Sequence, residues 1–97
     1  MNYTFKAKIW IYEGSSAWHF VTLPKKLSVE IKELFGQDRP GWGAVPVRVE
    51  VNGFLWKTSI FPDKKTGAYL LPLKVEARKT ANLGDGDTAN FKITILA

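Results

Sequence analysis

The segment 45–58 constrains the fold most, because an Asn52-Gly53 pair stands between two runs in which apolar and polar residues alternate. Asn-Gly suits a two-residue type I′ turn, since both central residues of that turn need positive φ. Counting outward from the turn predicts an antiparallel hairpin in which Arg48 lies opposite Lys57. The side chains predicted to share its apolar face are Val47, Val49, Val51, Phe54 and Trp56.

A two-residue apolar period predicts strands near both ends of the chain as well. Residues 3–12 alternate, and a turn at 13–16 leads into a second strand over 17–23, which gives an N-terminal hairpin. Residues 89–95 alternate in the same way. The side chains predicted to face inward from the first and last strands are Tyr3, Phe5, Ala7, Ile9, Ile11, Phe91, Ile93 and Ile95.

Two segments that begin with proline predict short helices. Pro24 and Pro72 each follow a leucine, and proline suits the first position of a helix because its φ is already near the helical value. Gly36 is expected to end the first helix, and Asn82 or Gly84 the second, because these residues adopt positive φ easily. The side chains predicted to face the core are Leu27, Ile31, Leu34 and Phe35, then Leu73, Ala77 and Ala81.

The pairs Leu23-Pro24 and Leu71-Pro72 lie about half the chain apart, and each follows a hairpin and precedes a predicted helix. This similarity predicts an internal duplication with half-repeats at about 3–36 and 45–95. Ninety-seven residues with 45% hydrophobic content suffice for one domain, 1–97. We expect a mainly β fold, a small closed barrel with pseudo-two-fold symmetry and two short peripheral helices, because closure removes exposed strand edges.

The bulk composition narrows the class of partner. The chain has a net charge of +5, no cysteine and no apolar run long enough to cross a membrane. We therefore expect a soluble cytoplasmic protein that does not bind a membrane. Positive charge favours association with polyanions, acidic proteins or anionic small molecules, and solubility alone is the alternative explanation.

The sequence contains no motif for catalysis, metal binding or a cofactor. His19 is the only histidine, and no serine or cysteine stands at the spacing of a catalytic triad. One histidine without cysteine is also too little for a typical zinc site. We expect no metal and no cofactor, and a binding domain rather than an enzyme. An enzyme would need a buried or strongly shifted Lys57, Lys74 or His19 in a cleft.

The candidate binding site combines cations from the hairpin and the second helix. Arg48, Lys57 and Ser59 share one strand face, and Lys74 and Arg78 stand one helical turn apart. These groups are predicted to converge on an anion. The alternative is a solvated cationic surface in which nearby glutamates act as counterions. The residues of the candidate site are Arg48, Lys57, Ser59, Lys74 and Arg78, with Trp42 or Trp56 as a wall.

The four tryptophans have two possible roles. Trp10, Trp18, Trp42 and Trp56 can stack on a base or a sugar, or they can pack in the core or at its rim. Core or rim packing is the more economical interpretation for a small barrel. Trp42 is the exception, because it stands between two glycines, outside any apolar period.

Several separated motifs resemble those of the domain-of-unknown-function 1905 family. They are the segments 18–24, 41–45, 56–62 and 69–74, together with Arg78-Lys79 and Gly86-Asp87. The resemblance covers nearly the whole chain and implies a double-split β-barrel, the fold also used by AbrB and MazE-type DNA-binding domains. Those are half-length chains that dimerise, whereas both halves lie in one chain here. The resemblance therefore implies a monomer rather than an obligate dimer, and it brings no established activity.

Two functions remain open at this point. The first is a binding domain whose cationic groove holds an anionic small molecule or an acidic protein. The second is sequence-tolerant binding of DNA or RNA, which rests on the analogy of fold. Salt distinguishes the two, because binding to a phosphate backbone weakens steeply and linearly in log salt across many sequences.

Overall fold

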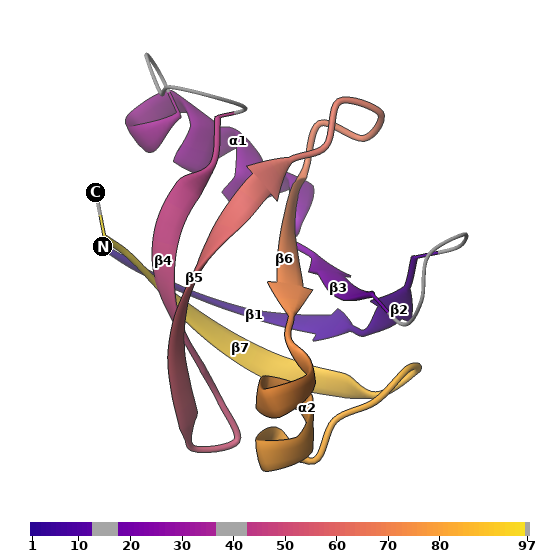
Figure 1. The fold of residues 1–97 in the computed structure, drawn as a ribbon. Coiled ribbons are helices and arrows are strands. Elements are labelled where there is room, and N and C mark those ends of the chain that lie inside the picture. Colours follow the sequence, from indigo (N-terminus) through magenta and orange to yellow (C-terminus); the bar gives the residue numbers. More distant parts are fainter. Residues whose placement is uncertain (13–17, 37–42, 97) are drawn as a thin grey trace.

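The computed structural model describes residues 1–12, 18–36 and 43–96, and in this part of the chain seven strands form one antiparallel sheet accompanied by two helices (Figure 1). The helices are α1 (Lys25–Phe35) and α2 (Val75–Ala81). The strands are β1 (Asn2–Lys8), β2 (Trp10–Ile11), β3 (His19–Thr22), β4 (Val45–Val51), β5 (Phe54–Pro62), β6 (Tyr69–Leu73) and β7 (Thr88–Ile95). None of the helices in the described ranges is long and apolar enough to cross a membrane.

The strand order is β1-β7-β4-β5-β6-β3-β2, so that β1 and β2, separated only by Ile9, stand at the two ends of the sheet. The main chain of Ile9 leaves the ladder and bonds instead to the turn before β7, with Ile9 N to Asp87 O at 2.8 Å and Gly86 N to Ile9 O at 2.9 Å. The mainly β class is therefore confirmed. The sheet forms an open half-barrel, and the closed barrel expected from the sequence is not clearly formed.

The central hairpin of β4 and β5 is the part of the fold that local sequence determines best. Asn52 has φ 49° and Gly53 has φ 79°, as a type I′ turn requires. Every residue pair predicted by counting outward from this turn is present, and Arg48 lies opposite Lys57. The Asn52 side chain also donates from Nδ2 to Ala81 O at 2.8 Å, which ties the end of α2 to the turn.

The core lies between the inner face of the curved sheet and the helices. Strand alternation buries one side of each strand, and Phe5 stacks on Phe91 with ring centroids 5.7 Å apart. One buried hydrogen bond fixes α1 to the sheet, because Tyr69 N donates to Ser28 Oγ at 2.9 Å. The largest fully buried side chains are Phe91, Ile9, Leu23, Ile31, Ile60, Leu71, Ile93, Val21, Val45, Val47, Val49 and Val51.

The second helix begins later than its proline predicts. Pro72 lies inside β6 opposite Phe20, and α2 starts only at Val75. Proline is tolerated there because β6 is paired with β5 only as far as Leu70, so that no β5 ladder continues beside it. By contrast, α1 begins directly after Pro24, as predicted.

Both predicted helix ends are confirmed, and three details need correction. Asn82 ends α2 with φ 57°, and Gly36 ends α1, but with an ordinary helical φ of −89° instead of a positive one. Ile11 and Leu34 are 41% and 54% exposed instead of buried. The break at Ile9 shifts Ile11 to the rim of the sheet, and Leu34 lies in the last turn of α1. The turn predicted at 13–16 lies outside the described residues.

Candidate functional site

The outer faces of β1, β7, β4 and β5 carry a cluster of cations, which we call the cationic sheet face. Alternation along each strand turns these side chains away from the core, and all of them are exposed. Glu50 is the carboxylate that accompanies them on these four strands. The cations of the cationic sheet face are Lys6, Lys8, Arg48, Lys57 and Lys92.

The strand register orders these side chains in rows across the sheet. In one row Lys57 stands opposite Arg48, and Arg48 stands opposite Thr94 on its other side. Neither cross-strand neighbour of Arg48 carries a negative charge. Like charges directly opposite each other on a strand pair are destabilising. This row is therefore a place where an anion would relieve a repulsion within the protein.

The next row contains the counterion of the face. Glu50 stands between Leu55 on β5 and Lys92 on β7. A shallow hollow of about 120 Å³ opens between the two rows and is lined by Arg48, Glu50, Leu55, Lys92 and Thr94. Two of its lining residues are cations and one is a carboxylate, so the hollow suits one anionic group rather than a large ligand.

The structure distributes the predicted site residues over several places. Arg48, Lys57 and Ser59 share the outer face of β4 and β5, as the register predicts. Trp56 points to the other face, where it stacks on Phe54 with centroids 5.6 Å apart. Its Nε1 is buried and has no hydrogen-bond partner. Trp42, the alternative wall, lies outside the described residues.

The two predicted cations of the second helix, Lys74 and Arg78, do not line the hollow beside Arg48. Lys74 is the N-cap of α2 and is exposed. Arg78 lines a second, open hollow of about 340 Å³. That hollow lies at the C-terminal end of α2, where the helix dipole disfavours an anion. Its lining residues are Arg78, Lys79, Asn82, Leu83, Gly84 and Asp87.

From the sequence alone, Trp10 and Trp18 are only separate stacking or packing residues, whereas the structure joins them to Tyr12 and Phe20 in one group on β2, β3 and their flanks, which we call the aromatic platform. Phe20 is at its centre, and the ring centroids of the other members lie 5.2 to 6.3 Å from the Phe20 ring. The signal in the sequence is the alternation along residues 3–12, which places Trp10 and Tyr12 on the same face of the strand. The members of the aromatic platform are Trp10, Tyr12, Trp18 and Phe20.

The buried polar groups elsewhere serve the fold. His19 lies in β3 opposite Leu73 and is 7% exposed. Burial, together with the nearby Glu30 carboxylate, raises the pKa of Tyr3 to about 12. In the described ranges, no three His, Cys, Asp or Glu side chains are grouped so that they could hold a metal ion.

A curved antiparallel sheet with two helices and a cationic outer face defines a small, mainly β domain. The family model described as "Domain of unknown function (DUF1905)" matches residues 5–93, and the chain belongs to this family. The family resemblance of the sequence motifs is thereby confirmed. No curated protein matches the chain.

Proposed function

We propose that this chain is a binding domain that holds an anionic partner on its cationic sheet face. The observation that carries the proposal is the set of five cations beside a single carboxylate on the outer faces of β1, β7, β4 and β5. Arg48 opposite Lys57 costs the isolated protein some stability, and a bound anion would turn this cost into two charge-assisted hydrogen bonds.

The shape of the face supports an extended partner. Sites for drug-sized ligands enclose about 300–1,000 Å³. The hollow beside Arg48 has about 120 Å³ and is shallow, which leaves room for one phosphate or carboxylate group. The remaining cations follow the strands on both sides of it. A chain with several negative groups fits this arrangement better than a single small anion.

The proposed binding surface contains Arg48, Lys57 and Ser59 from the predicted site. It also contains Lys6, Lys8 and Lys92. Lys74, Arg78 and Trp56 belong to the α2 side of the hairpin, and they would meet only a partner that passes around the β4–β5 turn. Figure 1 places this turn beside α2, at the lower end of the sheet. These three residues therefore provide controls for the sheet face.

We further propose that the domain acts as a monomer in the cytoplasm. Because only Ile9 separates the two terminal strands of the sheet, β1 and β2 would close a double-split barrel with two similar halves within one chain. A chain without cysteine has no disulfide to gain in an oxidising compartment. Light scattering at micromolar concentration tests the monomer, and a stable dimer would contradict it.

Binding of fluorescent polyanions at low salt tests the proposed function. Suitable probes are inorganic polyphosphate, double-stranded DNA and poly-glutamate. We expect binding that weakens linearly in log salt, and Arg48→Glu and Lys57→Glu should each reduce the slope by about 1, because each removes one cation that pairs with a phosphate. The control Lys74→Glu makes the same change in net charge away from the face and should have little effect. Absence of binding to all three probes, or equal weakening by Lys74→Glu, would refute the proposal.

A further inference from the structure

The aromatic platform exposes large side chains that a small domain normally uses in its core. Tyr12 is 53% and Trp18 is 59% exposed. Trp10, Tyr12 and Trp18 nevertheless form one group, with ring centroids 5.2, 6.3 and 6.0 Å from the ring of Phe20. Exposed apolar side chains that gather in one place mark interaction sites more often than single ones do.

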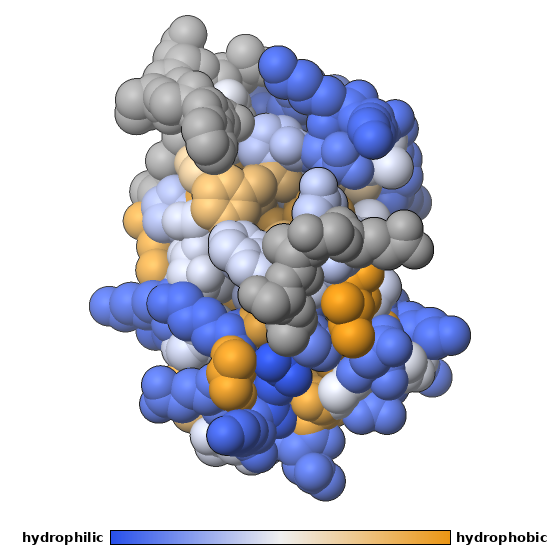
Figure 2. All heavy atoms as spheres, turned by 45° about the vertical axis from the view of Figure 1, so that its right-hand side comes forward, coloured by the Kyte–Doolittle hydropathy of each residue, from blue (hydrophilic) through white to orange (hydrophobic). Residues whose placement is uncertain are grey.

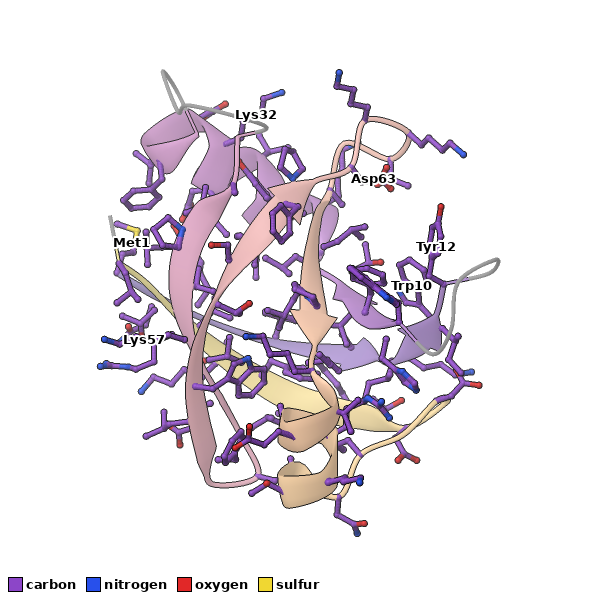
Figure 3. All side chains as sticks on the ribbon, viewed as in Figure 1. Met1, Trp10, Tyr12, Lys32, Lys57 and Asp63 are labelled. Carbon is purple, nitrogen blue, oxygen red and sulfur yellow. The ribbon has the colours of Figure 1, made fainter. Side chains whose placement is uncertain are left out.

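The platform is held in place from within the sheet. Trp10 and Phe20 are cross-strand partners, so their side chains leave the sheet on the same side. Trp10 Nε1 donates to Thr22 Oγ1 at 3.0 Å, which fixes the indole ring. Figure 3 shows Trp10 and Tyr12 together beside β2. A base that stacks on Tyr12 or Trp18 would therefore meet a ring that already packs against Phe20.

Strand β1 connects the cationic sheet face with the aromatic platform. Lys6 and Lys8 point outward from β1, and two residues later Trp10 continues the same outward series past the break at Ile9. Lys92 joins this path opposite Thr4. At about 3.3 Å per residue, the outer side of residues 2–10 spans roughly 26 Å. One end of the path carries Arg48 and Lys57, and the other end carries the aromatic rings.

The two surfaces face different directions, so a ligand would have to follow β1 around the molecule. In Figure 3, Lys57 lies at the left of the view, whereas Trp10 and Tyr12 lie at the right. Figure 2 brings the right-hand side forward and shows pale and orange side chains across its middle, with hydrophilic side chains around them. A flexible chain fits such a path, and a straight rigid rod does not.

We propose that the cationic sheet face and the aromatic platform together bind single-stranded nucleic acid, and this inference rests on the function proposed above. Phosphates lie along Lys92, Lys6 and Lys8, and unpaired bases stack on Tyr12 and Trp18. The combination selects the ligand class, because a positively charged track next to stacking rings is how proteins hold single strands. An acidic protein segment has negative charges but no regular series of rings that could stack on the platform. In a duplex the faces of the bases are stacked on one another inside the helix, so they cannot stack on Tyr12 and Trp18.

A pair of aspartates beside the path opposes this binding and provides an internal check. The turn that contains Asp85 and Asp87 is hydrogen-bonded to Ile9, at the junction of the cationic and aromatic parts. Asp87 accepts a hydrogen bond from Gly84 N at 2.8 Å, which gives its carboxylate a role in the turn. Asp85 is exposed, so its carboxylate adds negative charge near the path of the phosphates. Asp85→Asn should therefore strengthen binding of a single strand.

Three labelled probes of equal length separate charge from stacking: oligo-dT, an abasic strand with the same phosphates, and a DNA duplex. We expect oligo-dT to bind at least tenfold more tightly than the abasic strand and to quench tryptophan fluorescence. Trp18→Ala and Tyr12→Ala should each weaken oligo-dT binding by about 5- to 100-fold, the range expected when one base no longer stacks, and leave binding of the abasic strand unchanged. Trp18→Phe should restore most of the affinity.

The outcomes distinguish this inference from the function on which it rests. Equal binding of oligo-dT and the abasic strand, or tighter binding of the duplex or poly-glutamate, would overturn the stacking inference and leave the anion-binding surface intact. Loss of binding to every probe at low salt would overturn both. Both aromatic side chains are more than half exposed, so their variants should fold, and a circular dichroism spectrum that matches the unsubstituted protein checks this.

Discussion

Two charge reversals on the cationic sheet face should change stability in opposite directions. Lys57→Glu places a carboxylate opposite Arg48, so a repulsive cross-strand pair becomes an attractive one. Lys92→Glu places a carboxylate opposite Glu50, so an attractive pair becomes a repulsive one. Both variants lower the net charge of +5 by the same two units. The charge of the cross-strand neighbour on β4 is opposite in the two cases.

The expected change in the free energy of unfolding follows from the interaction energy of one cross-strand pair of charges. Opposite charges contribute roughly 0.2–1 kcal/mol, and like charges cost a similar amount. Lys57→Glu should therefore raise the free energy of unfolding by about 0.5–1.5 kcal/mol, and Lys92→Glu should lower it by a comparable amount. In a domain of this size 1 kcal/mol corresponds to about 4–8 °C in the midpoint of thermal unfolding. The midpoints of the two variants should differ by several degrees.

Thermal unfolding followed by circular dichroism at low salt and at 1 M salt measures this difference. The difference should shrink at 1 M salt, because the Debye length falls to about 3 Å and all four side chains are exposed. Both variants should also weaken polyanion binding, so Lys57→Glu should gain stability while its affinity falls. Equal shifts in both variants, or a difference that salt does not reduce, would refute the assigned neighbours as the cause.

Three further predictions concern the fold. Because burial raises the pKa of Tyr3 from 10.0 to about 12, the unfolded chain loses this proton first, and stability should fall between pH 10 and 12 by at most about 3 kcal/mol. Urea unfolding of Tyr3→Phe should show a shallower decline, and an identical pH profile would contradict the assignment. Ser28→Ala removes the acceptor of the buried Tyr69 N–H and should lower the free energy of unfolding, measured with urea, by about 1–3 kcal/mol. An unchanged urea midpoint would show that this hydrogen bond does not stabilise the fold. Gly53→Ala should cost about 1 kcal/mol, because Gly53 has a positive φ of 79° although nothing lies within 4 Å of the added Cβ. Gly36→Ala should cost more, because its Cβ would lie 2.8 Å from Tyr69 Oη. A larger cost for Gly53→Ala would contradict this reasoning.

The parts of the fold that sequence predicts correctly are those that depend on neighbours along the chain. The type I′ turn at Asn52 needs only its own two residues, and the register of β4 and β5 follows from it. The start of α2 could not be obtained in this way. The same Leu-Pro pair precedes α1 directly, whereas Pro72 is held in β6 by pairing with Phe20, which lies far away in the sequence.

In the candidate site, too, the sequence predicts the contacts within one hairpin but not the contacts between distant segments. Arg48 and Lys57 could be placed together because one hairpin contains both. Lys92 and Lys6 join them only through the pairing of β7 with β4 and with β1, which connects the two ends of the chain. The predicted approach of Lys74 and Arg78 required a contact between a helix and a distant sheet face. Period and turn chemistry carry no information about such a contact.

The break at Ile9 links the structure of the sheet to the proposed binding. Strand β1 pairs with β7 as far as Lys8, which lies opposite Thr88, the first residue of β7, so no β7 residue remains for pairing beyond Lys8. Ile9 is 1% exposed and bonds to the turn at Asp87, and the next residue, Trp10, pairs with Phe20 on β3. One outward series of side chains thus passes from lysines to aromatic rings. The buried residue between Lys8 and Trp10 is what brings charge and stacking into a single path.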